Sequence, residues 1–205
     1  MAEARIRPMD PAAGADPDDD DGDAAQITRS LGAPEQFAAL FDRHAPAIHS
    51  YVARRLGRDS ADDVVAEVFL VAFQRRGGYD LAQADARPWL YGIATNLIRR
   101  HRRDEIRMFR AIARSTADPP AEPLADRVTG RVAAQAVRGR LASALAGLSG
   151  AQRDVLLLVA SGLSIQETAA ALDVPAGTVA SRLARARRKV RAALGETSPA
   201  DEVEE

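Results

Sequence analysis

The chain has 205 residues, no cysteine and a net charge of −1 at pH 7. This length allows one or two small domains, and the lack of cysteine excludes disulfides and thiolate metal sites, which fits a reducing compartment. No apolar run approaches the ~18 residues of a membrane span, and the acidic N-terminus is the opposite of a secretory signal peptide. We therefore expect a cytoplasmic protein that does not insert into a membrane.

Charge is strongly segregated along the chain. Residues 1–26 hold eight acids and two arginines, and residues 196–205 hold five acids and no base, so the body between them carries a net charge of +10. A basic body between acidic ends is suited to nucleic-acid binding. Residues 1–30 also combine proline, glycine and a run of aspartates, which predicts a disordered acidic arm. Residues 196–205 form the corresponding acidic tail.

A first helical domain is expected over residues 31–114. Apolar residues at helical spacing predict one helix over residues 37–56, which Gly57 ends, and a second over residues 61–76, which Ser60 caps.

A loop over residues 79–85 leads into one long helix, which we expect Asp85 to cap. The first half of this helix is apolar and includes Trp89, which we interpret as a core residue. Its second half is crowded with arginines, namely Arg99, Arg100, Arg102, Arg103, Arg107 and Arg110. Residues 115–139 contain three prolines in their first half and show no clear period there, so they are interpreted as a flexible linker.

A second helical domain is expected over residues 140–195. Ser149 with Gln152, and again Ser164 with Glu167, have the spacing of a capping box, so a helix should begin at each serine. The second of these helices ends near Asp173, where the short turn into the next helix requires a positive φ that aspartate tolerates. Pro175 then fits the first turn of the last helix.

The last helix separates an apolar stripe from a polar face. Apolar residues recur at helical spacing from Val179 to Leu194. The opposite face and its flanks carry Thr178, Ser181, Arg182, Arg185 and Arg188. A helix of this kind fits the major groove of DNA, where arginine bridges guanine O6 and N7 or clamps a phosphate. The alternative is a solvated basic face on an ordinary packing helix, but the capped partner helix and the short turn favour DNA binding.

No stretch alternates with period two for long enough to predict a sheet. We therefore expect an all-α protein with two small helical domains joined by a flexible linker. The C-terminal domain should have four helices and include a helix-turn-helix.

The motifs of both domains resemble the bacterial RNA polymerase sigma factors of the extracytoplasmic-function (ECF) type. They are SADDVVAEVFLVAF (60–73), PWLYGIATN (88–96), QRDVLLL (152–158), ETAAALDVP (167–175) and GTVASRLARAR (177–187). The resemblance implies a factor that binds core RNA polymerase and directs promoter-specific initiation. Such a factor recognises the −35 and −10 elements and helps to melt the DNA, and the resemblance implies no cofactor and no enzymatic activity.

The resemblance also implies which parts of the chain meet which partner. Residues 31–114 would be sigma region 2, which docks on the clamp helices of the β′ subunit and reads the −10 element. Residues 140–195 would be sigma region 4, which reads the −35 element and meets the flap of the β subunit. Whether an anti-sigma factor is a further partner is left open.

Within region 2, the resemblance assigns polymerase docking to Asp62, Asp63, Glu67 and Phe69. It assigns contacts with the −10 DNA to Tyr79, Asn96, Arg99, Arg100 and Arg103. In region 4, Ser181 and Arg185 match positions that contact the −35 element. Phe69 is equally well explained as core, and Tyr79 as a loop aromatic that covers the core.

Two other functions are weighed against this one. A helix-turn-helix transcription regulator would bind duplex DNA independently of polymerase, but the Trp-Leu helix with its trailing arginines and the lack of a receiver pattern argue against it. An enzyme acting on nucleic acid would need a reactive or metal-binding cluster. The only histidines are His44, His49 and His101, and the first two miss the i, i+4 spacing of a helical metal pair.

Overall fold

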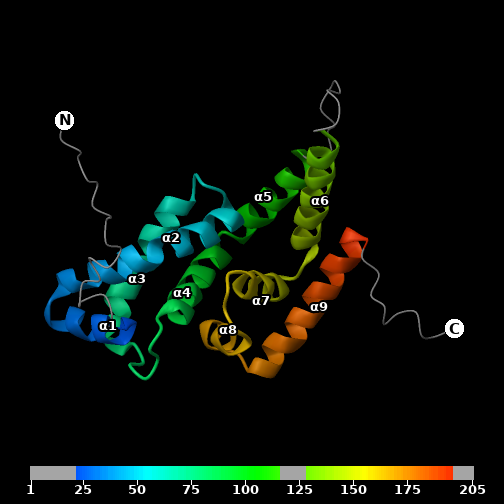
Figure 1. Cartoon of the computed structure of the whole chain (residues 1–205). Coiled ribbons are helices and arrows are strands. Elements are labelled where there is room, and N and C mark those ends of the chain that lie inside the picture. The colour runs from blue at the N-terminus through cyan, green and yellow to red at the C-terminus, as the bar shows by residue number, and fades with distance from the viewer. Residues whose placement is uncertain (1–21, 116–127, 196–205) are drawn as a thin grey trace, which may run out of the picture.

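The computed structural model describes residues 22–115 and 128–195, and all regular structure in these two stretches is helical (Figure 1). The first stretch contains α1 (Asp23–Gly32), η1 (Pro34–Gln36), α2 (Phe37–Leu56), α3 (Ala61–Arg75), η2 (Arg76–Gly78), α4 (Arg87–Arg100) and α5 (Arg102–Ser115). The second contains α6 (Val128–Gly147), α7 (Gly150–Ala160), α8 (Ile165–Leu172) and α9 (Ala176–Leu194). The predicted all-α fold is confirmed. No described helix is both long and apolar enough to cross a membrane.

Local sequence signals fix several helix ends. Both capping boxes form, because the hydroxyls of Ser149 and Ser164 each accept the backbone N–H three residues further on. Gly57 ends α2 with a φ of 91°, and Asp173 ends α8 in the left-handed region with a φ of 51°. One expected cap is absent: Ser60 lies at the N-cap position of α3, but its side chain makes no capping hydrogen bond.

The prediction of a disordered arm over residues 1–30 is wrong from residue 23 onward, because these residues form α1. Asp23 is only 5% exposed, and Ile27 is completely buried. The contacts that order α1 come from residues far along the chain, so composition alone does not reveal them. Residues 1–21 and the predicted tail, residues 196–205, lie outside the described residues.

The single long helix expected after Asp85 is also wrong, because it breaks at His101 into α4 and α5. On α5, Glu105 bonds Arg153 of α7 at 2.9 Å, and Phe109 also faces the C-terminal half. Phe109 packs there against Leu145 in a small apolar cluster.

The predicted linker over residues 115–139 is too long, because α6 already begins at Val128. Helix α6 packs along α5 and α9, and the pair α5 and α6 stands at the upper right of Figure 1. These tertiary contacts stabilise a helix whose Ala- and Gly-rich sequence shows no clear apolar stripe. The remaining linker residues, 116–127, lie outside the described part of the chain.

The two halves of the molecule pack directly against each other. The main apolar core lies among α1 to α4 and continues into Leu158 and Leu163 of the C-terminal half. Helices α4 and α8 approach so closely that a Cβ atom on Gly92 would lie 2.6 Å from the carbonyl oxygen of Ala171. Glycine at this position therefore sets how near the two helices can come.

A buried ionic network crosses the same interface. Arg55 of α2 bonds Glu105 of α5 at 2.5 Å and Asp154 of α7 at 2.6 Å, and Arg153 of α7 bonds Glu105 at 2.9 Å. All four side chains are at most 3% exposed. Arg153 also donates to three backbone carbonyls where α6 ends, namely those of Leu145, Ala146 and Leu148. Loss of one partner from such a buried group costs about 3–5 kcal/mol, because it leaves a charge without compensation.

We expect Gly92→Ala to push α4 and α8 apart without weakening α4. The new methyl group meets backbone that cannot rotate away, whereas alanine favours the helix by up to about 1 kcal/mol. Small-angle scattering should show a larger radius of gyration, and the thermal midpoint should fall. The control is Gly147→Ala, where a Cβ meets nothing within 4 Å. Identical scattering from wild type and Gly92→Ala would show that the contact does not limit the interface.

Candidate nucleic-acid interface and docking groove

Helices α8 and α9 form the predicted helix-turn-helix. The turn between them contains Asp173 in the left-handed conformation, and its backbone N–H bonds the carbonyl of Ala170 at 3.3 Å. Val179 and Leu183 of α9 pack with Val155 of α7 in a buried cluster. Because this stripe faces inward, the opposite side of α9 faces solvent.

The predicted DNA-contacting residues of α9 lie on that outer side. Ser181, Arg185 and Arg188 are exposed, and Thr178 and Arg182 are half-buried. Within the described part of the chain, no ion pair engages any of the three arginines. The Ser181 hydroxyl donates back to the carbonyl of Thr178 at 3.1 Å. The arginines are therefore available to a ligand, whereas the serine must rotate to reach one.

The loop between η2 and α4 begins with Tyr79, one of the residues predicted to contact the −10 DNA. The ring of Tyr79 is only 9% exposed and packs on Trp89, with 5.0 Å between ring centroids. Its hydroxyl donates to the carbonyl of Gln83 at 2.7 Å. Burial, followed by the nearby negative charges of Asp23, Asp85 and Asp80, raises the pKa of Tyr79 to about 12. In this structure the ring of Tyr79 covers the core, and its contact with the −10 DNA stays a prediction.

Residues 80–84 of this loop are exposed, and the apolar side chain of Leu81 among them is 51% exposed. The far end of the loop is fixed by Asp23, whose Oδ2 accepts the backbone N–H of Ala86 at 2.7 Å. The same oxygen lies 2.8 Å from Nε2 of His44, and Oδ1 lies 2.7 Å from Nη1 of Arg43. Burial alone would raise the pKa of Asp23, but the hydrogen bonds from His44, Ala86 and Arg43 outweigh it and lower the pKa to about 2.

The predicted −10 contacts on α4 and α5 are partly engaged by acids of the chain itself. Arg99 donates to Asn96 Oδ1 at 3.0 Å and to Asp154 of α7 at 3.0 Å. Arg100 lies 3.2 Å from Glu67 of α3. Arg103 is exposed, and the described residues provide no ion pair for it. A basic surface is therefore present where α4 ends and α5 begins, and Arg99 of this surface is shared with the C-terminal half.

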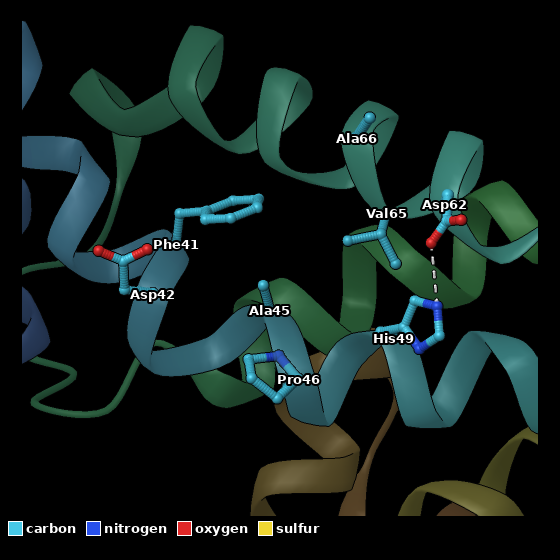
Figure 2. A pocket seen from close by; sticks show the side chains of 8 residues that line it. All are labelled: Phe41, Asp42, Ala45, Pro46, His49, Asp62, Val65 and Ala66. Atoms are coloured by element: carbon cyan, nitrogen blue, oxygen red, sulfur yellow. Dashed lines mark hydrogen bonds and ion pairs between the residues drawn. The ribbon is translucent and has the colours of Figure 1, made fainter.

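A groove of about 500 Å³ lies between α2 and α3 (Figure 2). It is lined by Phe41, Asp42, Ala45, Pro46, His49, Asp62, Val65 and Ala66. Its walls are mostly apolar, and at one end His49 bonds Asp62 at 3.1 Å, as Figure 2 shows. Asp62 is 86% exposed, so the groove combines an apolar floor with an acidic rim.

Phe69 does not belong to the open surface of this groove. It is 5% exposed and packs edge-on against Phe41, with ring centroids 4.8 Å apart, so it is a core residue. The exposed apolar residues here are instead Phe41, at 43%, and Leu70, at 55%. Phe41 follows the buried Leu40 and Leu70 follows the buried Phe69, so the helical period alone does not identify them as exposed. Of the other residues predicted for docking, Asp63 is exposed and Glu67 is half-buried.

Comparison with known proteins identifies the family. The model of Sigma-70 region 2 matches residues 40–119, and the model of Sigma-70 region 4 matches residues 138–190. The chain is 35% identical over 162 residues to the ECF RNA polymerase sigma factor SigL of Mycobacterium tuberculosis, which covers 77% of this chain and 88% of SigL. It is an ECF sigma factor. It is also 34% identical over 165 residues to the RNA polymerase sigma factor NccH of Alcaligenes xylosoxydans xylosoxydans, covering 77% of this chain and 86% of NccH.

Solved structures agree with this assignment. The sigma factor CnrH, in complex with the cytosolic domain of CnrY, superimposes with a TM-score of 0.59 and 25% identity, covering 86% of this chain and 99% of CnrH. The sigma factor RpoE of Bartonella quintana, in complex with the anti-sigma factor NepR, gives a TM-score of 0.55 at 22% identity and shows the shared fold.

This sigma factor directs transcription initiation by core RNA polymerase at promoter DNA, and a polymerase-independent regulator is thereby set aside. The buried ionic network can now be placed by region. Arg55 and Glu105 belong to region 2, whereas Arg153 and Asp154 belong to region 4. Helix α1 lies before the region 2 match, which begins at residue 40.

The lowered pKa of Asp23 predicts how its contribution to stability depends on pH. Because the carboxyl group ionises more readily in the folded chain than its ordinary pKa of 3.8 allows, its charge stabilises the fold above about pH 4. That contribution is lost as the pH falls toward about 2. We expect Asp23→Asn to lower the free energy of unfolding by roughly 2 kcal/mol at pH 7. Denaturant titrations of both proteins at pH 7, 4 and 2.5 should show this difference shrinking, and a difference that stays constant with pH would contradict the assignment.

Proposed function

We propose that this sigma factor reads the −35 element with α9 and the −10 element with the loop and helices after α3, while the groove between α2 and α3 docks on polymerase. The observation that carries the proposal is the exposed face of α9, on which three arginines have no acidic partner among the described residues. Ordinary packing does not require such a face, but phosphates and guanine edges provide the acceptors that it lacks.

The residues that we assign to the −35 element are Thr178, Ser181, Arg182, Arg185 and Arg188. The N-terminal part of a recognition helix enters the major groove most deeply. Arg185 therefore fits a base edge, whereas Arg188, nearly one turn further on, fits a phosphate. Ser181 adds a smaller contact that orients the helix.

For the −10 element we assign Asn96, Arg99, Arg100 and Arg103 to the DNA strand and its backbone. The exposed residues of the loop, 81–84, provide a surface for an extruded base, in place of the buried ring of Tyr79. An extruded base needs a pocket or platform, which the loop offers before the start of α4, while Arg99 and Arg100 at the other end of the same helix would hold the DNA backbone further along.

Binding both elements together requires regions 2 and 4 to separate. Elements centred at −10 and −35 are about 25 base pairs apart, or roughly 85 Å along B-form DNA. Here α4 of region 2 and α8 of region 4 touch at Gly92 and Ala171, so both DNA-binding faces belong to one compact body. Separation also releases Arg99 from Asp154 for use on DNA.

The groove between α2 and α3 suits a helical partner. Its apolar floor offers a hydrophobic anchor, and its acidic rim complements a basic coiled coil such as the clamp helices of the β′ subunit. Region 4 would meet the flap of the β subunit. The solved relatives CnrH and RpoE are bound to CnrY and to the anti-sigma factor NepR, and we propose that an anti-sigma factor is also a partner of this chain, in the cytoplasm.

Run-off transcription tests the proposed function. Purified chain and sigma-free core polymerase are combined with genomic DNA fragments, and each component is also tested alone. Specific transcripts only when both are present support the proposal. Promoter binding by the chain without polymerase, and no specific transcript with it, would contradict it.

Arg185→Ala and Arg188→Ala should separate base reading from phosphate binding. We expect Arg185→Ala to cost about 1–3 kcal/mol at the −35 element and to relax preference at one base position. Arg188→Ala should weaken binding to all sequences alike and reduce the salt slope by about one.

The measurement is run-off transcription by each holoenzyme on a library randomised across the −35 element. Arg188→Ala is the matched control, since both arginines are exposed on the same helix. If Arg185→Ala lowers output uniformly with an unchanged base profile, Arg185 is a phosphate clamp and its assignment is wrong.

Asp63→Arg should weaken core polymerase binding by about tenfold or more, because it reverses a charge beside the proposed docking groove. The exposed position of Asp63 means that the thermal midpoint should change little. Glu35→Arg is the control, since it is an equally exposed acid in η1, outside the groove lining. Affinity measured by fluorescence anisotropy would contradict the docking assignment if Asp63→Arg and Glu35→Arg bound core polymerase equally well.

A further inference from the structure

The side chain of Asp23 joins three elements that are distant in the sequence. From its position at the start of α1, it accepts hydrogen bonds from the α2 side chains Arg43 and His44 and from the backbone of Ala86, directly before α4. An ionised carboxylate only accepts, so Nε2 of His44 carries the proton in this contact. The carboxylate is 5% exposed, so its three donors replace the water that it has lost.

One of these donors holds the loop proposed to take the extruded −10 base. Ala86 is fully buried at the end of that loop, and its N–H points away from the hydrogen-bond ladder of α4 and into Asp23. The other end of the loop is held by Tyr79, through its bond to Gln83 and its packing on Trp89. Among the described residues, Asp23 is the only side chain from another helix that hydrogen-bonds this loop.

We propose that Asp23 is a positioning residue for promoter melting: it holds the loop of residues 79–86 so that residues 81–84 face the base extruded from the −10 element. This inference rests on the proposed role of the loop. It assigns to α1, which precedes the region 2 match, a part in reading the promoter.

The hydrogen bonds of Asp23 predict how strongly each substitution should weaken the contact. Alanine at position 23 removes the carboxylate that accepts from the Ala86 N–H and from the side chains of Arg43 and His44. Asparagine keeps one acceptor oxygen but loses the charge and turns an N–H₂ group toward one of the donors. The loop should therefore be loosened most by Asp23→Ala and partly by Asp23→Asn.

The charge of Asp23 is balanced within the fold by the side chains of Arg43 and His44. Arg43 and His44 lie against its carboxylate, so Asp23 is not free to repel DNA phosphates. Deletion of residues 1–21 therefore removes the acidic run and leaves the contact intact. This deletion is the control for loss of the acidic charge. Asp59→Ala, in the exposed turn before α3, is the control for loss of a single acid.

The experiment uses holoenzyme carrying wild-type chain, Asp23→Ala, Asp23→Asn or either control. Fluorescence of 2-aminopurine placed through the −10 element reports base extrusion, and permanganate reactivity of thymines reports melting. We expect Asp23→Ala to reduce melted complex by about tenfold and to relax base preference at the −10 element. The amount of melted complex formed by Asp23→Asn should lie between those of wild type and Asp23→Ala. For both variants, affinity for core polymerase and base preference at the −35 element should stay within about twofold of wild type.

Hydrogen exchange of the free chain tests the contact without polymerase. Asp23→Ala should speed exchange of the Ala86 amide more than that of amides in α2 and α3. A second route to the same contact is His44→Gln, which weakens the support of the carboxylate and should reduce melting in the same direction.

Three results would overturn the inference. The first is an unchanged base preference at the −10 element in Asp23→Ala. The second is an equal loss of preference at the −10 and −35 elements, together with faster hydrogen exchange throughout the chain. The third is the same melting defect when residues 1–21 are deleted. A failure of the proposed function is distinguishable, because wild-type holoenzyme would then give no specific transcript while the Ala86 amide still responded to Asp23→Ala.

Discussion

Two buried arginines and two buried carboxylates hold regions 2 and 4 together, and the closed arrangement of the molecule depends on them. Burial costs each charge several kcal/mol, and the network offsets this only because every member meets an opposite charge across the interface. When the regions separate, water can hydrate all four groups, so much of that cost is recovered. An interface of this kind is closed in the free chain yet less costly to open than a purely apolar one of the same size.

The same network reaches the DNA-binding surface of region 2. Asp154 of region 4 bonds both Arg55 and Arg99, and Arg55 also donates to the hydroxyl of Tyr51 at 2.5 Å. Tyr51 in turn bonds Thr95 of α4 at 2.9 Å. These contacts connect the interface between the regions to α4, the helix that carries most of the proposed −10 contacts. Arg99 therefore takes part both in the contact between the two regions and in the proposed −10 contacts.

Features that depend on neighbouring residues could be predicted from the sequence, whereas those that depend on distant partners could not. The capping box at Ser164 and the left-handed turn at Asp173 need only residues within a few positions, and they reveal the helix-turn-helix. The order of α1 depends on Asp23 meeting Ala86, which lies 63 positions away. The break after α4 places Glu105 against Arg153, 48 positions further on. The burial of Tyr79 likewise depends on how the loop folds over Trp89, which no local spacing specifies.

The acidic N-terminal segment illustrates why composition can mislead about a single residue. By sequence, Asp23 is the last member of a run of acids that predicts disorder. In the fold its carboxylate is buried but accepts hydrogen bonds from three donors, which lower its pKa to about 2, and it ties α1 to the elements of region 2. Seven acids and two arginines remain in residues 1–21, so any electrostatic competition with DNA must come from that net charge of −5. A truncation within α1 would remove this charge and also the contact of Asp23 with the loop of residues 79–86. Only a truncation that ends before residue 22 removes the charge and keeps the contact.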